Sequence, residues 1–97
     1  ILLLGQADGA EVITIEDLET SKGLHPIQEA MIQKHGSQCG YCTPGIVMSL
    51  FALAHAQHEK IDRDVVNDAL AGNLCRCTGY DKIIRSVQAA AKEMRGA

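Results

Sequence analysis

Two glycine-rich stretches of this chain carry all of its cysteines, in two close pairs. The first cysteine loop (residues 36–44) contains Cys39 and Cys42, and the second cysteine loop (residues 72–79) contains Cys75 and Cys77. Each loop begins Gly-x-x-Cys, and in each the second cysteine is followed by threonine. Sulfurs this close together can hold zinc or an iron–sulfur cluster, or they can pair as disulfides.

The spacing of the cysteines favours a metal over disulfides. No export signal is visible in the sequence, and pairs with one or two intervening residues suit metal ligation better than disulfide formation. Structural zinc sites commonly use Cys-x2-Cys twice, and the spacing from Cys75 to Cys77 is tighter than that. An iron–sulfur cluster accepts several spacings, so zinc and a cluster both stay open at this point.

Length and composition restrict the class of protein. The chain has 97 residues, enough for one small domain, and its hydrophobic share of 46% with only 3% aromatic residues predicts an aliphatic core of packed helices. The formal net charge of −3 and the lack of a basic stripe exclude a general nucleic-acid binder. The longest apolar run, residues 46–54, is too short to span a membrane. We therefore expect a cytoplasmic protein with no membrane span.

The first 19 residues differ in pattern from the rest of the chain. Residues 1–4 and 12–15 are β-rich, and a turn signal containing Asp-Gly separates them, which predicts a hairpin. A lone hairpin is marginal in water, so these strands are expected to be the end of a sheet whose other strands are missing. We therefore divide the chain into a remnant of a truncated domain at residues 1–20 and a helical domain at residues 21–97.

From Leu24 onward the apolar periodicity is that of helices. Four helices are expected, and their start signals are, in order, His25-Pro26, Thr43-Pro44 with Thr43 as N-cap, Asp62 or Asp64, and Thr78 or Gly79. Gly36 is expected to end the first helix and Gly72 the third. The residues expected to face inward are Ile27, Met31, Ile32, Ile46, Val47, Leu50, Phe51, Ala54, Val65, Val66, Ala69, Leu70, Ile83, Ile84, Val87, Ala90 and Ala91.

Short connections between these helices predict a four-helix bundle. The order helix, Gly-x-x-Cys, second cysteine, threonine, helix occurs twice. This repeat suggests two helical hairpins related by a pseudo-twofold axis, which would bring the two cysteine loops face to face. Both cysteine pairs lie just before a predicted helix N-terminus, where the helix dipole should lower the pKa of a thiol. The four histidines (His25, His35, His55 and His58) are scattered, and we expect solvated side chains rather than ligands.

The two cysteine loops resemble the signature of the molybdenum hydroxylase family. The similar segments are residues 38–45, Gln-Cys-Gly-Tyr-Cys-Thr-Pro-Gly, and residues 72–80, Gly-Asn-Leu-Cys-Arg-Cys-Thr-Gly-Tyr. The family includes xanthine dehydrogenases, aldehyde oxidases and the small subunits of carbon monoxide dehydrogenase. The resemblance covers residues 24–91 and is to a four-helix bundle that holds the 2Fe–2S cluster nearest the molybdenum. Residues 24–28, 35–38 and 46–49 look most like the xanthine dehydrogenase branch.

Several residue roles are implied by this resemblance alone. Cys39, Cys42, Cys75 and Cys77 resemble the cluster ligands. Gln38 resembles the residue whose amide hydrogen-bonds the pterin of the molybdenum cofactor, molybdopterin, and Cys77 resembles the ligand closest to that pterin. In this family a plant-type ferredoxin domain with a second 2Fe–2S cluster precedes the bundle, and residues 1–19 resemble its final strands.

The resemblance also implies a function. The family hydroxylates a heterocycle or an aldehyde and leaves two electrons on molybdenum. This domain would relay those electrons singly from molybdopterin to the ferredoxin-type cluster and then to FAD, without substrate chemistry of its own. The implied partners are a molybdenum-binding large subunit or domain, an FAD-binding subunit or domain, and a ferredoxin-like 2Fe–2S domain. A zinc-stapled helical interaction module is the alternative, and a secreted disulfide-bonded bundle is a third hypothesis.

Overall fold

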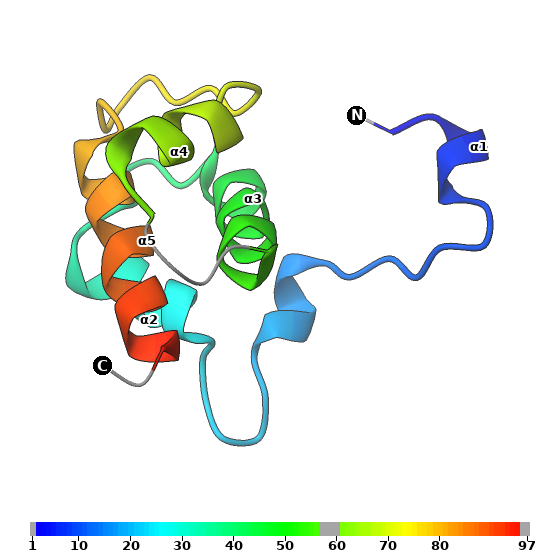
Figure 1. Cartoon of the computed structure of the whole chain (residues 1–97), viewed down its shortest axis with the longest axis horizontal. Coiled ribbons are helices and arrows are strands. Elements are labelled where there is room, and N and C mark those ends of the chain that lie inside the picture. Colours follow the sequence, from blue (N-terminus) through cyan, green and yellow to red (C-terminus); the bar gives the residue numbers. More distant parts are fainter. Residues whose placement is uncertain (1, 57–60, 96–97) are drawn as a thin grey trace.

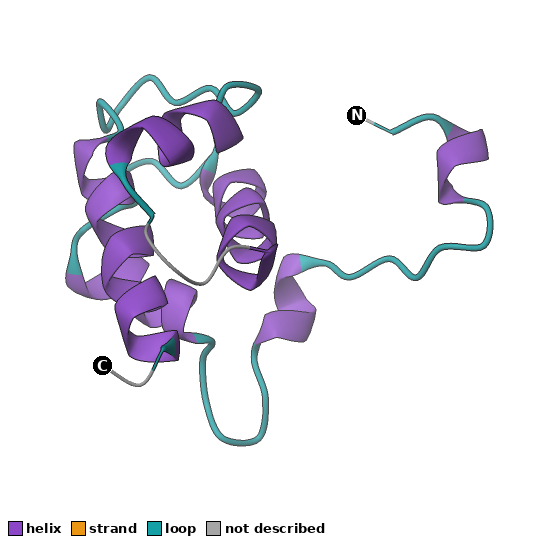
Figure 2. Ribbon diagram, in the orientation of Figure 1, coloured by secondary structure: helices purple, strands orange, loops and turns teal. Residues whose placement is uncertain are grey.

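The computed structural model describes residues 2–56 and 61–95, and its regular elements are helical (Figures 1 and 2). In chain order they are α1 (Leu4–Ala7), the 3-10 helix η1 (Ile15–Leu18), α2 (Pro26–Gln33), α3 (Thr43–Ala56), α4 (Arg63–Ala69) and α5 (Asp81–Met94). Residues 24–56 and 61–95, the helical unit, gather around one core, and residues 2–20, the arm, contact it through η1 and otherwise extend away from it (Figure 1). The prediction of a mainly helical protein is confirmed.

The core lies between α2, α3, α4 and α5, and α2 packs most extensively against α5. All five apolar positions predicted to face inward on α5 are buried: Ile83, Ile84, Val87, Ala90 and Ala91. Ser86 on the same helix is also fully buried, and its hydroxyl donates to the carbonyl oxygen of Lys82 at 2.7 Å. One inward prediction on α2 is wrong, because Ile32 is 65% exposed. On α3, Phe51 is only partly buried and lies against the rings of His25 and His55.

The C-terminus of α2 shows why a glycine occupies position 36. Gly36 was expected to end the helix through its own conformational freedom, but the left-handed residue is His35, with φ of 58°. The N–H of Gly36 donates to the carbonyl oxygen of Met31 at 2.8 Å, as in a Schellman motif. A Cβ at Gly36 would lie 2.5 Å from Met31 Sδ and 3.1 Å from Ser86 Oγ. Gly36 is therefore needed for close packing of the first cysteine loop on α5.

Two predicted caps have different outcomes. Asp62 caps α4 as expected, since its carboxylate accepts from the N–H of Val65 at 3.0 Å. The prediction of Thr43 as the N-cap of α3 is wrong by one residue, because Thr43 already lies in the helix and the carbonyl of Cys42 accepts the N–H of Ile46 at 3.0 Å. Cys42 is thus fixed directly at the start of α3.

The predicted hairpin in residues 1–19 is not formed. Within the described part of the chain no strand is present, and the only bridge is the isolated pair Thr20 and Gly23. Residues 12–14 have no regular structure, and α1 begins within the first predicted strand. Residue 1 lies outside the described residues. The physical reason is that a two-stranded hairpin alone buries too little apolar surface, and here Leu3, Leu4 and Val12 are 71%, 91% and 66% exposed.

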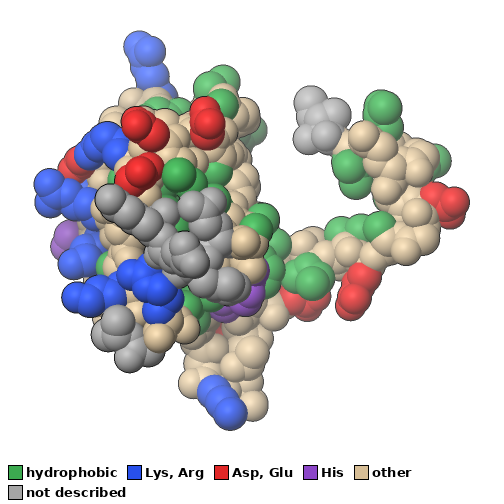
Figure 3. Space-filling model, viewed as in Figure 1, with side chains coloured by type: hydrophobic (Ala, Val, Ile, Leu, Met, Phe, Trp, Pro, Cys, Tyr) green, Lys and Arg blue, Asp and Glu red, His purple; other side chains and the backbone are tan. Residues whose placement is uncertain are grey.

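The arm and the helical unit differ in charge. Acidic side chains follow the arm, whereas Lys and Arg side chains gather on one side of the helical unit (Figure 3). The arm joins the helical unit through η1, where Leu18 is buried in the core and Ile15 packs against it. Among the residues that the structure describes, no helix is long and apolar enough to cross a membrane. The four-helix bundle with a pseudo-twofold axis and the division at residues 20 and 21 stay predictions.

Candidate metal centre

The two cysteine loops meet at one cavity of about 210 Å³. Its lining residues come from both loops: Cys39, Tyr41, Cys42, Leu74, Cys75, Arg76 and Cys77. None of the four cysteines forms a disulfide. The chain therefore brings all four sulfurs to a shared site, although residues Cys42 and Cys75 are more than 30 positions apart in the sequence.

The sulfurs interact in two pairs, and each pair takes one sulfur from each loop. Cys75 helps to raise the pKa of Cys42, and Cys39 raises the pKa of Cys77, so each sulfur is influenced by one from the other loop. Cys42 and Cys75 are half-buried and pack against the core, whereas Cys39 and Cys77 are exposed. The centre thus has an inner pair of sulfurs and an outer pair. In the described residues, no three or more His, Cys, Asp or Glu side chains converge as ligands of a single metal ion.

The two thiols of the inner pair differ in pKa, because the pKa of Cys75 is lowered and that of Cys42 is raised. A hydrogen bond from the Thr78 hydroxyl, 3.1 Å from Cys75 Sγ, lowers the pKa of Cys75 to about 7. Burial, followed by the hydrogen bond to Cys75, raises the pKa of Cys42 to about 11. The prediction that helix ends lower the pKa at both cysteine pairs is therefore wrong for Cys42. Cys42 does lie at the start of α3, but its burial disfavours the charged thiolate and outweighs the effect of the helix end.

The outer pair lies at an apolar rim. The hydrogen bond between Cys39 and Cys77 raises the pKa of Cys77, and the N–H of Tyr41 donates to Cys39 Sγ at 3.5 Å. Tyr41 and Leu74 are 95% and 84% exposed, one from each loop. The site therefore opens outward beside two large unburied side chains, a surface of the kind that a partner protein covers.

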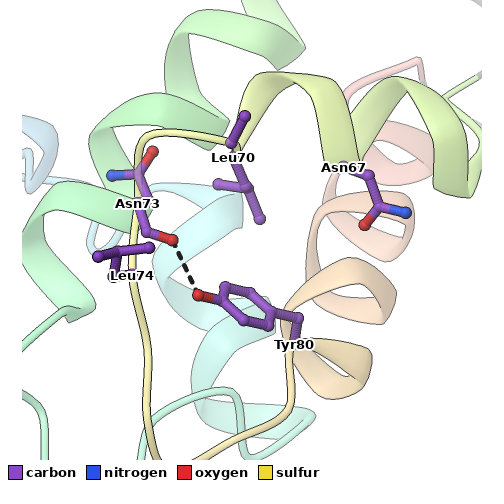
Figure 4. Close-up of a pocket in the computed structure, with 6 residues that line it drawn as sticks. Asn67, Leu70, Asn73, Leu74 and Tyr80 are labelled. Atoms are coloured by element: carbon purple, nitrogen blue, oxygen red, sulfur yellow. Dashed lines mark hydrogen bonds between the residues drawn. The ribbon is translucent and has the colours of Figure 1, made fainter.

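Three residues outside the predicted site hold the second cysteine loop. Tyr80 Oη accepts the N–H of Cys75 at 2.6 Å. The same hydroxyl donates to the carbonyl oxygen of Asn73 at 3.0 Å (Figure 4). The amide oxygen of Asn73 accepts the hydroxyl of Ser49 at 2.8 Å, which connects the loop to α3. Sequence reasoning did not single out these residues, although Tyr80 closes the second similar segment.

Gln38 and Arg76 are both exposed. Arg76 lines the cysteine cavity between Cys75 and Cys77, whereas Gln38 is not among the lining residues. His25 and His55 face each other away from the cysteines, with their Nε2 atoms 3.3 Å apart. His58 lies outside the described residues.

The donor set fits a 2Fe–2S cluster. Such a cluster is held by four cysteine thiolates, two for each iron, and the structure presents four sulfurs as two cross-loop pairs around one cavity. Comparison with known proteins agrees, since the family described as 2Fe-2S binding domain matches residues 14–88. The chain belongs to this family. Its members bind a 2Fe–2S cluster, so the site is a candidate cluster site rather than a zinc staple.

Relatives in this family are oxidoreductases. The chain is 47% identical over 90 residues to a xanthine dehydrogenase of Oryza sativa subsp. japonica, covering 92% of this chain and 7% of that protein. It is 49% identical over 85 residues to aldehyde oxidase 1 of Oryctolagus cuniculus, covering 87% of this chain and 6% of that protein. The crystal structure of aldehyde oxidoreductase from Desulfovibrio gigas superposes with a TM-score of 0.88 at 35% identity, covering 99% of this chain and 11% of that one.

The chain thus spans less than a tenth of the length of the two relatives. The similarity to the xanthine dehydrogenase and to the aldehyde oxidase is nearly equal, at 47% and 49% identity. These values show the molybdenum hydroxylase relationship that the two cysteine loops indicated. They do not separate the two branches of enzymes.

Proposed function

We propose that Cys39, Cys42, Cys75 and Cys77 are the ligands of the 2Fe–2S cluster. The observation that carries this assignment is that all four cysteines, two from each loop, line one cavity, and the influence of Cys75 on Cys42 and of Cys39 on Cys77 supports their pairing across the loops. One pair would hold each iron, so each iron would bridge the two loops. The two helical hairpins would then be joined by the cluster as well as by their apolar core.

We infer that the chain is the electron-relay domain of a molybdenum hydroxylase. When bound, the cluster supplies reversible one-electron transfer. Support comes from the family match and from the similarity to a xanthine dehydrogenase and an aldehyde oxidase. Two-electron oxidation of a substrate in a molybdenum-binding partner requires such a one-electron carrier to pass the electrons onward. The xanthine dehydrogenase branch stays the proposed one, on the sequence pattern of residues 24–28, 35–38 and 46–49.

The burial of the two sulfur pairs gives the relay a proposed direction. Cys39 and Cys77 are exposed at the apolar rim, while Cys42 and Cys75 lie against the core. A partner seated on the rim would therefore meet the outer pair first, which supports Cys77 as the ligand nearest molybdopterin. Gln38 is exposed next to Cys39 and is free of the cavity lining, so its amide is available to a pterin in that partner.

We also propose the partners and the role of the arm. The partners would be a molybdenum-binding domain on the rim, a ferredoxin-like domain with a second 2Fe–2S cluster, and an FAD-binding domain. Residues 1–20 would complete the ferredoxin-like domain, and the exposed Leu2, Leu3 and Leu4 would be buried there. The domain division between residues 20 and 21 belongs to this proposal, and a cytoplasmic location stays a prediction.

A visible spectrum together with metal analysis tests the function. The purified protein should absorb between roughly 400 and 600 nm, lose that absorption on reduction with dithionite, and contain iron and acid-labile sulfide in equal amounts. A colourless protein with stoichiometric zinc would instead support the zinc-stapled interaction module. A protein without metal and without free thiols would support a disulfide-bonded bundle, and both results would refute the relay.

A further inference from the structure

Tyr80 ties together the residues that lead into Cys75. Its hydroxyl oxygen accepts the backbone N–H of Cys75 at 2.6 Å, and its O–H donates to the carbonyl oxygen of Asn73 at 3.0 Å. The phenol ring reaches from the start of α5 to the backbone of the second cysteine loop (Figure 4). A single hydroxyl thus fixes a donor and an acceptor on either side of Leu74.

The position of Tyr80 depends on an unusual backbone conformation. Tyr80 is the N-cap of α5 and adopts a left-handed conformation with φ of 70°, directly after Gly79 with φ of 69°. A non-glycine residue in this region carries a conformational cost. The N–H of Tyr80 donates to the hydroxyl of Thr78 at 3.2 Å, and the same hydroxyl lies 3.1 Å from Cys75 Sγ. The turn therefore aims the phenol back at the loop that it closes.

The same network reaches the first half of the site. The amide oxygen of Asn73 accepts the hydroxyl of Ser49 on α3, and a Cβ at Gly45 on α3 would lie 3.4 Å from Asn73 Nδ2. Because α3 begins directly after Cys42, the contact between Ser49 and Asn73 couples the two cysteine loops. Tyr80 and Asn73 are both half-buried, so solvent competes with these hydrogen bonds less than at an exposed site.

The hydrogen bond to Cys75 also has an electrostatic consequence. Backbone N–H groups that donate to the sulfurs of an iron–sulfur cluster stabilise its reduced, more negative state and raise its reduction potential. The N–H of Cys75, a proposed ligand, donates to a phenol oxygen instead. Tyr80 therefore removes one nearby donor from competition for sulfur.

We propose that Tyr80 is a positioning residue that holds the reduction potential of the cluster low and slows the loss of iron. It acts by engaging the N–H of Cys75 and by closing the loop that carries the ligands Cys75 and Cys77. This inference rests on the proposed function, because it requires the four cysteines to hold a 2Fe–2S cluster.

The test is Tyr80→Phe in the complete protein purified from its own host. The substitution keeps the ring and removes only the hydroxyl. We expect the midpoint potential of the cluster, followed by its electron paramagnetic resonance signal, to rise relative to the unsubstituted protein. We also expect iron to be released to a chelator about 10 to 100 times faster, the range seen when an outer-shell partner of a metal ligand is removed.

Gln88→Leu is the matched control on the same helix. The side-chain amide of Gln88 donates to the carbonyl oxygen of Ile61 at 3.2 Å, and neither residue lines the cysteine cavity. This variant should lower the melting temperature without changing the potential. Should Tyr80→Phe not accumulate as folded protein, Ser49→Ala removes the link from α3 to Asn73 and should raise the potential in the same direction by a smaller amount.

The outcomes separate the two proposals. An unchanged or lowered potential in Tyr80→Phe, or in Ser49→Ala where that variant replaces it, overturns the role of Tyr80 even if iron is lost faster, because a merely structural contact would affect only iron loss. An unsubstituted protein that contains no cluster overturns the proposed function and this inference together. A cluster that is normal in the unsubstituted protein and in Tyr80→Phe overturns this inference alone.

Discussion

The first cysteine loop runs directly into α3 at Cys42, whereas three residues, Thr78, Gly79 and Tyr80, separate Cys77 from α5. The first loop is positioned by close packing, since Gly36 lies against Met31 and Ser86. The second loop is positioned by side-chain hydrogen bonds, chiefly those of Tyr80. Two loops that share a Gly-x-x-Cys start and a threonine after the second cysteine are thus held by different kinds of interaction. The comparison shows that a repeated sequence pattern fixes which atoms meet at a site without fixing what holds them there.

The helices that precede the two loops also differ, in the side chain that caps each N-terminus. α2 is capped by the imidazole of His25, and α4 is capped by the carboxylate of Asp62. The glycines at the start of the loops also differ, because nothing lies within 4 Å of a Cβ placed at Gly72. Substitutions at equivalent positions of the two loops therefore test the comparison directly.

The largest expected effect is the loss of one inner ligand from either loop. Cys42→Ser and Cys75→Ser should each abolish the visible absorption of the cluster, because the iron that this pair would hold would lose one of its two thiolates. Because the cluster would join the two cysteine loops, both variants should also melt at a lower temperature. Absorption spectra, iron content and thermal unfolding are the measurements. A normal cluster in either variant would contradict the assignment of that cysteine as a ligand and the prediction that the cluster needs a ligand from each loop.

Alanine at the first glycine of each loop tests whether close packing positions the first loop and not the second. Gly36→Ala places a Cβ 2.5 Å from Met31 Sδ and should lower the free energy of unfolding by about 1–3 kcal/mol, the usual cost of overpacking a core. Gly72→Ala is the matched control, since that site is open and Gly72 is not among the positive-φ residues. It should change stability by no more than about 0.5 kcal/mol. Equal losses, measured by denaturant unfolding, would contradict different anchoring of the loops.

The threonine after each second cysteine offers a smaller contrast. The Thr78 hydroxyl accepts the N–H of Tyr80 and lies beside Cys75 Sγ, whereas the Thr43 hydroxyl bonds only to that of Ser37, 2.8 Å away at an exposed position. Thr78→Val should therefore cost about 1 kcal/mol of unfolding free energy and speed iron loss. Thr43→Val should cost less and leave iron loss unchanged. The reverse order would show that the first loop also relies on hydrogen bonds.

The smallest expected effect is a pH dependence that belongs to the first hairpin alone. His25 Nδ1 accepts the N–H of Ile27 at 3.2 Å, which requires an unprotonated nitrogen. Burial, followed by the nearby His55, lowers the pKa of His25 in the folded protein. The unfolded chain therefore binds the proton more readily. The stabilising contribution is complete above pH of about 6.5 and is lost as the pH falls through the lower, folded pKa.

Loss of this cap should reduce the free energy of unfolding by up to about 1 kcal/mol between pH 7.5 and pH 5. His25→Asn is the comparison, because asparagine caps a helix without titrating. Its denaturant unfolding should show a weaker dependence on pH over that range. An identical pH profile in both proteins would assign the dependence to groups other than His25.

Structural features that depend on residues close together in the sequence were predictable from the sequence. The burial of Ile83, Ile84, Val87, Ala90 and Ala91 on α5 follows from helical periodicity, and the Asp62 cap follows from a local hydrogen bond. The hairpin prediction failed because strands, unlike helices, need a partner to satisfy their backbone, and residues 12–15 have none in the described chain. The shift of the cap from Thr43 to Cys42 reflects how weakly a sequence defines the last residue of an element.

The sequence by itself determined which four residues form the candidate cluster site and that helices carry them. Only the tertiary structure decided how the sulfurs pair across the loops, that Cys42 is desolvated, and that Tyr80 engages the N–H of Cys75. It also decided why position 36 is glycine, because the atoms that exclude a side chain belong to Met31 and to Ser86 on α5. Spacing along a chain is a local property, whereas burial and hydrogen-bond choice depend on what distant segments bring into contact.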